Sequence, residues 1–99
     1  MPKLAFSEEA RDQLKELQAD SGLAKRLRAV RAALARMEAD LRHPSLHTHE
    51  FQSQPCPHGK KLYEAYAENR TPAAYRIFWC YLPAPPPDTV FIVAITPHP

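Results

Sequence analysis

The sequence contains no uninterrupted apolar run of the roughly 18 residues that a membrane-spanning helix requires. Its N-terminus also lacks the apolar stretch of a secretory signal peptide. These two absences predict a cytoplasmic protein with no membrane partner. Hydrophobic residues make up 44% of the 99 positions and charged residues 24%. This composition argues against disorder and predicts one globular domain over residues 1–99.

Cysteine is also scarce, since the chain has only Cys56 and Cys80. Two cysteines are too few for the disulfide framework of a small secreted domain, and no C-x-x-C motif is present. We therefore expect two reduced thiols.

Basic residues are concentrated in one part of the chain. Residues 1–21 hold three basic and five acidic side chains, whereas residues 22–42 hold six basic and two acidic ones, and the remainder is balanced. The first segment is therefore negative and the second is strongly positive. A polyanion is expected to meet the second segment first.

Two helices are predicted in the first half of the chain. Ser7 followed by Glu8 and Glu9 is typical of a helix start, because the hydroxyl can cap a free amide and carboxylates suit the positive end of the helix dipole. Asp20-Ser21-Gly22 separates the helices, and Pro44 ends the second one. The second helix carries one apolar stripe, formed by Leu23, Leu27, Val30, Leu34, Met37 and Leu41.

After Pro44 the pattern changes to short segments rich in aromatic and β-branched residues. The predicted strands are His47–Gln52, Lys61–Glu68, Ala74–Leu82 and Thr89–Thr96, with a possible short edge strand at Lys3–Phe6. The stiff, proline-rich loop Pro83–Asp88 joins the last two. Because the connecting loops are short, successive strands should pair antiparallel. The predicted fold class is α+β, with an N-terminal helical hairpin packed on a three- to four-stranded antiparallel sheet.

Arg76 lies in an otherwise apolar and aromatic strand. A permanently charged guanidinium in such surroundings needs either an acidic partner or a bound anion. One interpretation is an ion pair with Glu64 or Glu68 on the neighbouring strand, and the other is a phosphate clamp. The two interpretations are compatible if the ion pair of Arg76 opens when a substrate binds. A carboxylate beside an arginine is a poor base, so we interpret Glu64 as an orienting partner.

Several histidines could also take part in chemistry. His98 follows the last strand, where an imidazole can act as a general acid, although a penultimate residue is commonly part of a frayed tail. A second set could in principle bind zinc, but its spacing matches no standard zinc motif. That set is His43, His47, His49, Cys56 and His58. We expect no metal and interpret His47 or His49 as a general base near Arg76.

The order of a helix, a basic helix, three antiparallel strands and a terminal histidine resembles the RelE/ParE superfamily of bacterial toxins. The matching segments are Leu41–Leu46 at the helix exit, Tyr75–Tyr81 with its strand arginine, and Val90–Ile95 followed by His98. The resemblance implies a RelE-like fold and the toxin role in a type II toxin–antitoxin system.

The RNA-cutting branch of this superfamily cleaves mRNA in the ribosomal A site without a metal or cofactor, by attack of a ribose 2′-hydroxyl on the adjacent phosphate. The resemblance implies Arg76 as the phosphate stabiliser and His98 as the acid, and we add His49 and Glu64 to the predicted catalytic set. Predicted RNA-backbone contacts are Lys25, Arg28, Arg31, Arg36, Lys60 and Lys61. The implied partners are a cognate antitoxin, the ribosome and mRNA, with no direct contact to DNA.

This sequence departs from the superfamily in the strand before Arg76, where basic residues are largely replaced by Tyr63–Glu68. Two alternatives therefore remain open. The chain could be a non-enzymatic, ParE-like toxin or interaction module that inhibits a protein such as gyrase. It could also be a degenerate member that only binds RNA or a partner.

Overall fold

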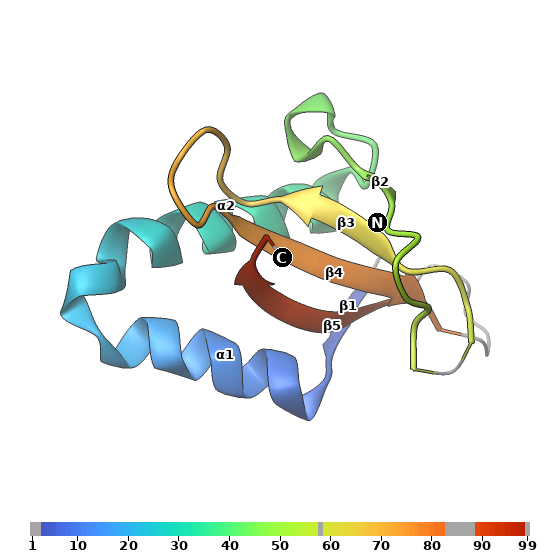
Figure 1. Ribbon diagram of the computed structural model, residues 1–99, viewed down its shortest axis with the longest axis horizontal. Helices are drawn as coiled ribbons and strands as arrows, with labels where there is room; N and C mark the ends of the chain where they lie inside the picture. The colour runs from blue at the N-terminus through green and yellow to red at the C-terminus, as the bar shows by residue number, and fades with distance from the viewer. Residues whose placement is uncertain (1–2, 58, 83–88, 99) are drawn as a thin grey trace.

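The computed structural model describes residues 3–57, 59–82 and 89–98, so His58 and the predicted loop Pro83–Asp88 lie outside the described residues. Five strands form one sheet in the order β1-β5-β4-β3-β2 (Figure 1). The elements follow one another as β1 (Lys3–Phe6), α1 (Glu8–Ala19), α2 (Ala24–Ala39), β2 (His49–Glu50), β3 (Tyr63–Tyr66), β4 (Tyr75–Tyr81) and β5 (Thr89–Pro97), with short 3-10 turns at Ser21–Leu23 and Pro44–Leu46. No helix in the described ranges is long and apolar enough to cross a membrane.

The predicted α+β class is confirmed, and the possible edge strand at Lys3–Phe6 is present as β1, ahead of the helical hairpin that the predicted fold class put first. The predicted sheet was wrong in two respects. It has five strands instead of three to four, and it is mixed because β1 pairs parallel to β5, with Leu4 opposite Val90 and Phe6 opposite Ile92. The pairs β2–β3, β3–β4 and β4–β5 are antiparallel as predicted. Short loops dictate antiparallel pairing only between consecutive strands. The first and last strands are joined through the whole chain, so that constraint does not apply to them.

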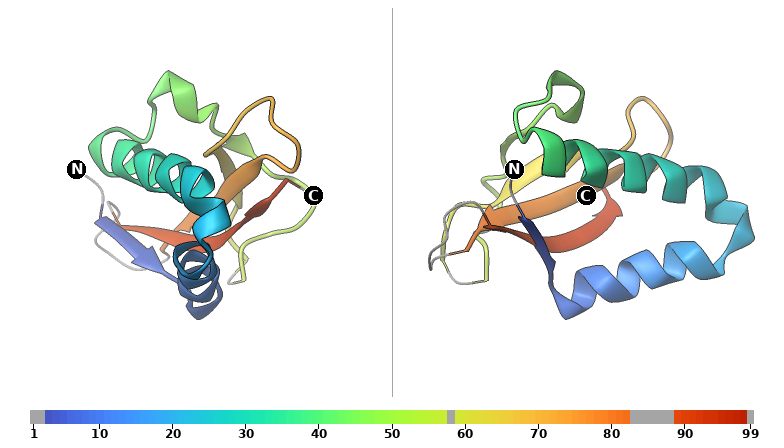
Figure 2. Two further views of the ribbon diagram at one scale, coloured as in Figure 1. Left: turned by 90° about the vertical axis from the view of Figure 1, so that its left-hand side faces the viewer. Right: turned by 180° about the vertical axis from the view of Figure 1, so that it is seen from behind.

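Both helices begin and pack as their sequence patterns indicate. The Ser7 hydroxyl accepts a hydrogen bond of 2.9 Å from the Ala10 amide, which caps α1, and donates one of 2.7 Å to the Val93 carbonyl of β5. All six residues of the apolar stripe pack in the main core, with Val30, Leu34 and Met37 buried. Seen from behind, α2 lies in front of β3 and β4, whereas α1 runs beside β5 (Figure 2).

An irregularity in β5 decides which side chains reach each face of the sheet. Phe78 pairs with Ala94 but the next residue, Trp79, pairs with Ile92, which leaves Val93 as an extra residue in β5. Ile92 and Ile95 therefore both enter the helix-facing core. Beyond the bulge, alternation places Ala94, Thr96 and His98 on the opposite face.

The face opposite the helices has a smaller core, formed by Cys56, Leu62, Phe78 and Cys80. Cys56 and Cys80 are joined by a disulfide with a Cα–Cα separation of 6.3 Å. The expectation of two reduced thiols was therefore wrong. Sequence spacing and composition could not reveal the pair, because the loop before β3 folds back over β4 only in three dimensions.

Candidate functional site

Four side chains predicted to act in catalysis meet on the sheet face opposite the helices. Three of them, His49, Arg76 and His98, surround the carboxylate of the fourth, Glu64. The side chain of Glu64 is only 1% exposed. Its strand neighbours Tyr63 and Ala65 belong to the helix-facing core, so the alternation of the strand directs Glu64 to the other face. A carboxylate buried this deeply requires charged or hydrogen-bonding partners.

His98 makes the shortest of these contacts, with 2.6 Å between its Nδ1 and Glu64 Oε2. Its backbone amide donates a 2.9 Å hydrogen bond to the Ala74 carbonyl, which ties the chain end to the start of β4. The tail is thus anchored and not frayed at this position. The ring remains half exposed. With Nδ1 donating to the carboxylate, Nε2 is left without a partner among the described residues and is available for proton transfer.

His49 is held differently, because both of its ring nitrogens face acceptors. Nε2 lies 2.8 Å from Glu64 Oε1, and Nδ1 lies 2.8 Å from the carbonyl oxygen of His47. Both contacts are hydrogen bonds at the same time only when both nitrogens carry protons, and in that form His49 is a cation. The predicted base is instead the neutral ring, with Nε2–H donating to Glu64 and an unprotonated Nδ1 turned away from the His47 carbonyl.

Arg76 completes the cluster from β4, with its side chain 9% exposed. Its Nε lies 3.6 Å from Glu64 Oε2, its guanidinium donates to the main-chain oxygen of Glu68, and its Cζ lies 3.6 Å from the ring centroid of Tyr66. The structure therefore shows the ion pair with Glu64. The other predicted partner, the Glu68 carboxylate, instead pairs with Arg26 at 3.0 Å.

The arrangement combines one anion with up to three cations. When His49 and His98 are both protonated, the positive charges of these rings and of Arg76 exceed the single negative charge of Glu64. A site with excess positive charge and a half-exposed imidazole attracts a phosphate and can exchange a proton with it.

A cavity of about 610 Å³ lies next to His98 on the same face. Its walls include Phe51, Phe78, Thr96 and Gln54. The two phenylalanine rings are 5.0 Å apart and nearly perpendicular. The cavity therefore has apolar rings, on which a nucleobase can stack, next to the imidazole of His98, which can lie beside the phosphate of that nucleotide.

The predicted RNA-backbone residues lie away from this cluster. Lys25, Arg28, Arg31 and Arg36 are exposed on α2, and the sheet separates that helix from Glu64. Lys60 and Lys61 are exposed on the segment that leads into β3, where the Lys61 ammonium lies 4.0 Å from the Glu50 carboxylate. The structure therefore gathers the four predicted catalytic residues and leaves the six basic ones on other surfaces.

The five residues considered for zinc do not form a site in the described part of the chain, where no group of three or more possible ligands is placed to hold a metal ion. Cys56 is in the disulfide, and His49 contacts Glu64. The ring of His47 lies 4.9 Å from that of Tyr66.

Sequence reasoning missed Tyr66, whose ring contacts both the ring of His47 and the guanidinium of Arg76. The signal was present, because alternation along β3 puts Tyr66 on the same face as Glu64. It also missed Arg26, which reaches from α2 to the Glu68 carboxylate and donates a 2.7 Å hydrogen bond to the carbonyl of Pro72. Those contacts hold the turn that precedes Arg76.

No family model and no curated protein sequence matches the chain. Two solved structures share its fold over nearly the full length of both chains. One is a YoeB/ParE toxin from Agrobacterium tumefaciens, with a TM-score of 0.70, 8% sequence identity, and coverage of 98% of this chain and 99% of that one. The other is a YoeB dimer from Staphylococcus aureus, with a TM-score of 0.65, 14% identity, and coverage of 99% and 98%. The chain therefore has the fold of YoeB/ParE toxins, which agrees with the resemblance seen in the sequence.

Proposed function

We propose that this chain is the toxin of a toxin–antitoxin system and that it cleaves RNA through the Glu64 cluster. In this proposal a ribose 2′-hydroxyl attacks the adjacent phosphate, and the ribosome presents the mRNA. A cognate antitoxin holds the activity in check by covering the sheet face that carries the cluster. The shared fold with YoeB/ParE toxins supports the toxin role.

The chemistry needs a proton donor for the leaving 5′-oxygen and positive charge for the oxygens of the phosphoryl group. His98 supplies the proton through its free Nε2, while Glu64 accepts the hydrogen bond from Nδ1 and fixes the orientation of the ring. Arg76 supplies the positive charge, and His49 adds to it when its ring is protonated. For the base role predicted from the sequence, His49 starts neutral, with Nε2–H donating to Glu64, and its unprotonated Nδ1 turns from the His47 carbonyl to accept the proton of the 2′-hydroxyl.

The observation that carries this proposal is the Glu64–His98 pair. A buried carboxylate that orients a half-exposed imidazole is the arrangement of a proton-transfer site, and a purely structural ion pair would not need a histidine held at the surface. The adjoining cavity, which His98 lines, supports the proposal because it offers space for substrate beside that ring.

The test is cleavage of mRNA on purified ribosomes by the wild-type chain and by His98→Ala and His49→Ala. We expect His98→Ala to lower the cleavage rate by roughly 10²- to 10⁴-fold, the range for losing a general acid. His49→Ala should lower the rate less than His98→Ala if His49 supplies charge alone, because Arg76 still provides positive charge. An equal, large loss in both variants would assign His49 as the base. Full cleavage by His98→Ala would refute the nuclease proposal.

One observation favours a second candidate, a ParE-like toxin that acts without catalysis. Arg76 is nine-tenths buried, is paired with Glu64 and donates to the main-chain oxygen of Glu68, although its Nε has no hydrogen-bond partner among the described residues. On this alternative, expression in a bacterial host arrests growth with intact mRNA and an induced DNA-damage response. The His98→Ala variant then remains as toxic as the wild type, whereas the nuclease proposal requires its toxicity to fall.

A further inference from the structure

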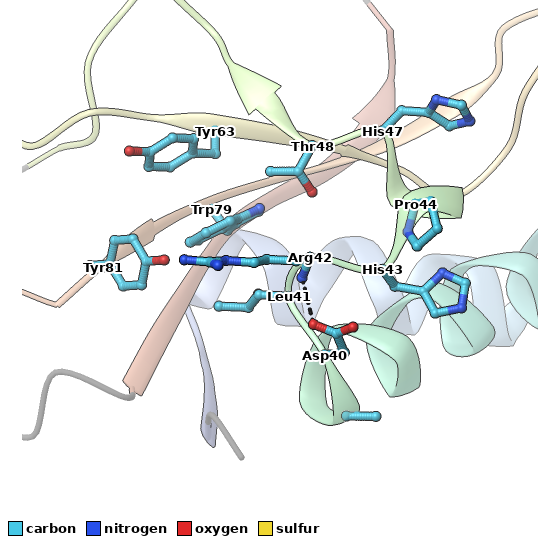
Figure 3. Close-up of a pocket in the computed structure, with 11 residues that line it drawn as sticks. Asp40, Leu41, Arg42, His43, Pro44, His47, Thr48, Tyr63, Trp79 and Tyr81 are labelled. Atoms are coloured by element: carbon cyan, nitrogen blue, oxygen red, sulfur yellow. Dashed lines mark hydrogen bonds between the residues drawn. The ribbon is translucent and has the colours of Figure 1, made fainter.

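A second cavity, of about 750 Å³, opens on the other side of the sheet from the Glu64 cluster, between the C-terminal end of α2 and the aromatic side chains of β3 and β4 (Figure 3). Tyr63, Trp79 and Tyr81 form its aromatic wall, and Leu41, Arg42 and Thr48 line it from the segment after α2. The volume is in the range of small-molecule and cofactor sites.

The aromatic wall presents rings in two orientations. Tyr63 and Trp79 are stacked, with ring centroids 4.8 Å apart, while Tyr81 meets the Trp79 ring nearly edge-on at 5.1 Å. Tyr81 is 42% exposed and is the large hydrophobic side chain that this face leaves open to solvent. An exposed ring beside a buried indole offers a stacking surface for one flat aromatic group.

The indole nitrogen of Trp79 supplies a second and independent observation. Trp79 is only 2% exposed, yet its Nε1 has no hydrogen-bond partner among the described residues. In the view of Figure 3, the edge of the ring that carries Nε1 is turned toward Thr48, which lines the cavity. A buried indole N–H without an acceptor is costly, and tryptophan usually finds a partner for it. The cavity thus lacks an acceptor that an occupant would provide.

Arg42 gives the site its charge. Its side chain runs along the cavity beside the Trp79 ring and toward Tyr81 (Figure 3). The guanidinium forms no hydrogen bond or ion pair with any described residue, since Asp40, the nearby carboxylate, accepts from the Arg42 backbone amide instead. An unpaired guanidinium next to aromatic rings is suited to a phosphate attached to a flat base.

We infer that this cavity, which we call the aromatic pocket, binds a nucleoside 5′-phosphate. The base stacks on Tyr81, an acceptor on the base takes the hydrogen bond of Trp79 Nε1, and Arg42 binds the phosphate. Because Trp79 Nε1 is sealed from solvent, side chains that line the pocket must move for the base to reach it. This inference is independent of the proposed RNA cleavage, because the two sites lie on opposite faces of the sheet.

The test uses the fluorescence of Trp79, which is the single tryptophan of the chain and therefore reports on this pocket alone. The full-length protein is titrated with adenosine 5′-monophosphate, with adenosine, with inorganic phosphate and with a short DNA oligonucleotide. We expect saturable quenching by the nucleotide, at a Kd about tenfold lower than for adenosine. The DNA oligonucleotide has no 2′-hydroxyl, so the proposed cleavage cannot occur during the titration. The binding result is therefore valid whether or not the chain is a nuclease.

Single substitutions test the role of each residue in the aromatic pocket. Arg42→Ala should lower the affinity for the nucleotide to that for adenosine, and Tyr81→Ala should weaken the binding of both. The control Arg11→Ala, at an exposed arginine on α1, should change neither affinity. Calorimetric titration of Trp79→Phe, which keeps a buried ring but removes the donor, should show weaker binding of the base. Tighter binding of the oligonucleotide than of the mononucleotide assigns the site to a nucleic-acid strand, and the reverse assigns it to a free nucleotide. No saturable quenching by either, or an unchanged nucleotide affinity in Arg42→Ala, overturns the inference.

Discussion

The Oε2 atom of Glu64 lies 2.6 Å from Nδ1 of His98, although the two residues are 34 positions apart in the chain. Glu64 is buried in the middle of β3, and His98 follows the end of β5, two strands away in the sheet. The contact therefore crosses β4, which contributes Arg76 between them. A buried carboxylate thus sets the direction of a surface imidazole.

Glu64→Gln should lower the RNA-cleavage rate while the protein remains folded. The amide keeps the size of the side chain but cannot accept hydrogen bonds from both histidines through two oxygens. We expect the RNA-cleavage rate to fall by at least about 10²-fold, because His98 loses its fixed orientation and tautomer. The measurement is the single-turnover cleavage rate, with circular dichroism to confirm the fold. Glu50→Gln, an exposed carboxylate on the neighbouring strand β2, is the matched control and should leave the rate unchanged.

Arg76→Met should destabilise the fold even though it adds no polar group. It removes the permanently charged partner of a carboxylate that is 1% exposed, and loss of one partner of a buried ion pair costs about 3–5 kcal/mol of unfolding free energy. Urea denaturation measures this change. Arg31→Met on the solvent side of α2 is the control, and an equal, small loss in both variants would show that Arg76 contributes no more than a surface charge.

Neutralising the exposed basic residues of α2 should weaken RNA binding without changing stability. Replacing Arg28 and Arg31 by Gln removes two cations that have no described ion pair, so the free energy of unfolding should stay within about 0.5 kcal/mol of the wild type. If both contact RNA phosphates, the slope of log affinity against log salt should decrease by about 0.7 for each contact. An unchanged slope would place the RNA on a different surface.

The disulfide should stabilise the protein measurably. Cys56 and Cys80 close a loop with a sequence separation of 24, for which the chain-entropy model gives about 3 kcal/mol. The double variant Cys56→Ser/Cys80→Ser should therefore unfold at a lower urea concentration than the wild type. Reductant should lower the midpoint of the wild type by a similar amount and leave the double variant unaffected. A wild-type midpoint that does not respond to reductant would contradict the pairing.

The local elements follow from the sequence because their causes are local. The Ser7 cap and the apolar stripe of the second helix depend on residues within one or two turns of each other, and both are confirmed. The three antiparallel pairings follow in the same way from short connections between consecutive strands. Strand alternation was also sufficient to place Arg76 and Phe78 on the face opposite Ile77 and Trp79.

Tertiary structure alone decided how distant segments meet. The parallel pairing of β1 with β5, the Cys56–Cys80 disulfide and the extra residue Val93 leave no periodic signal in the sequence. The sequence named His49, Glu64, Arg76 and His98 as candidate catalytic residues, and it gave Glu64 as one possible partner of Arg76. Only the folded sheet, in which β2, β3, β4 and the end of β5 lie side by side, placed His49, Arg76 and His98 around the Glu64 carboxylate. Register between strands is fixed by packing of the whole core and not by any one segment.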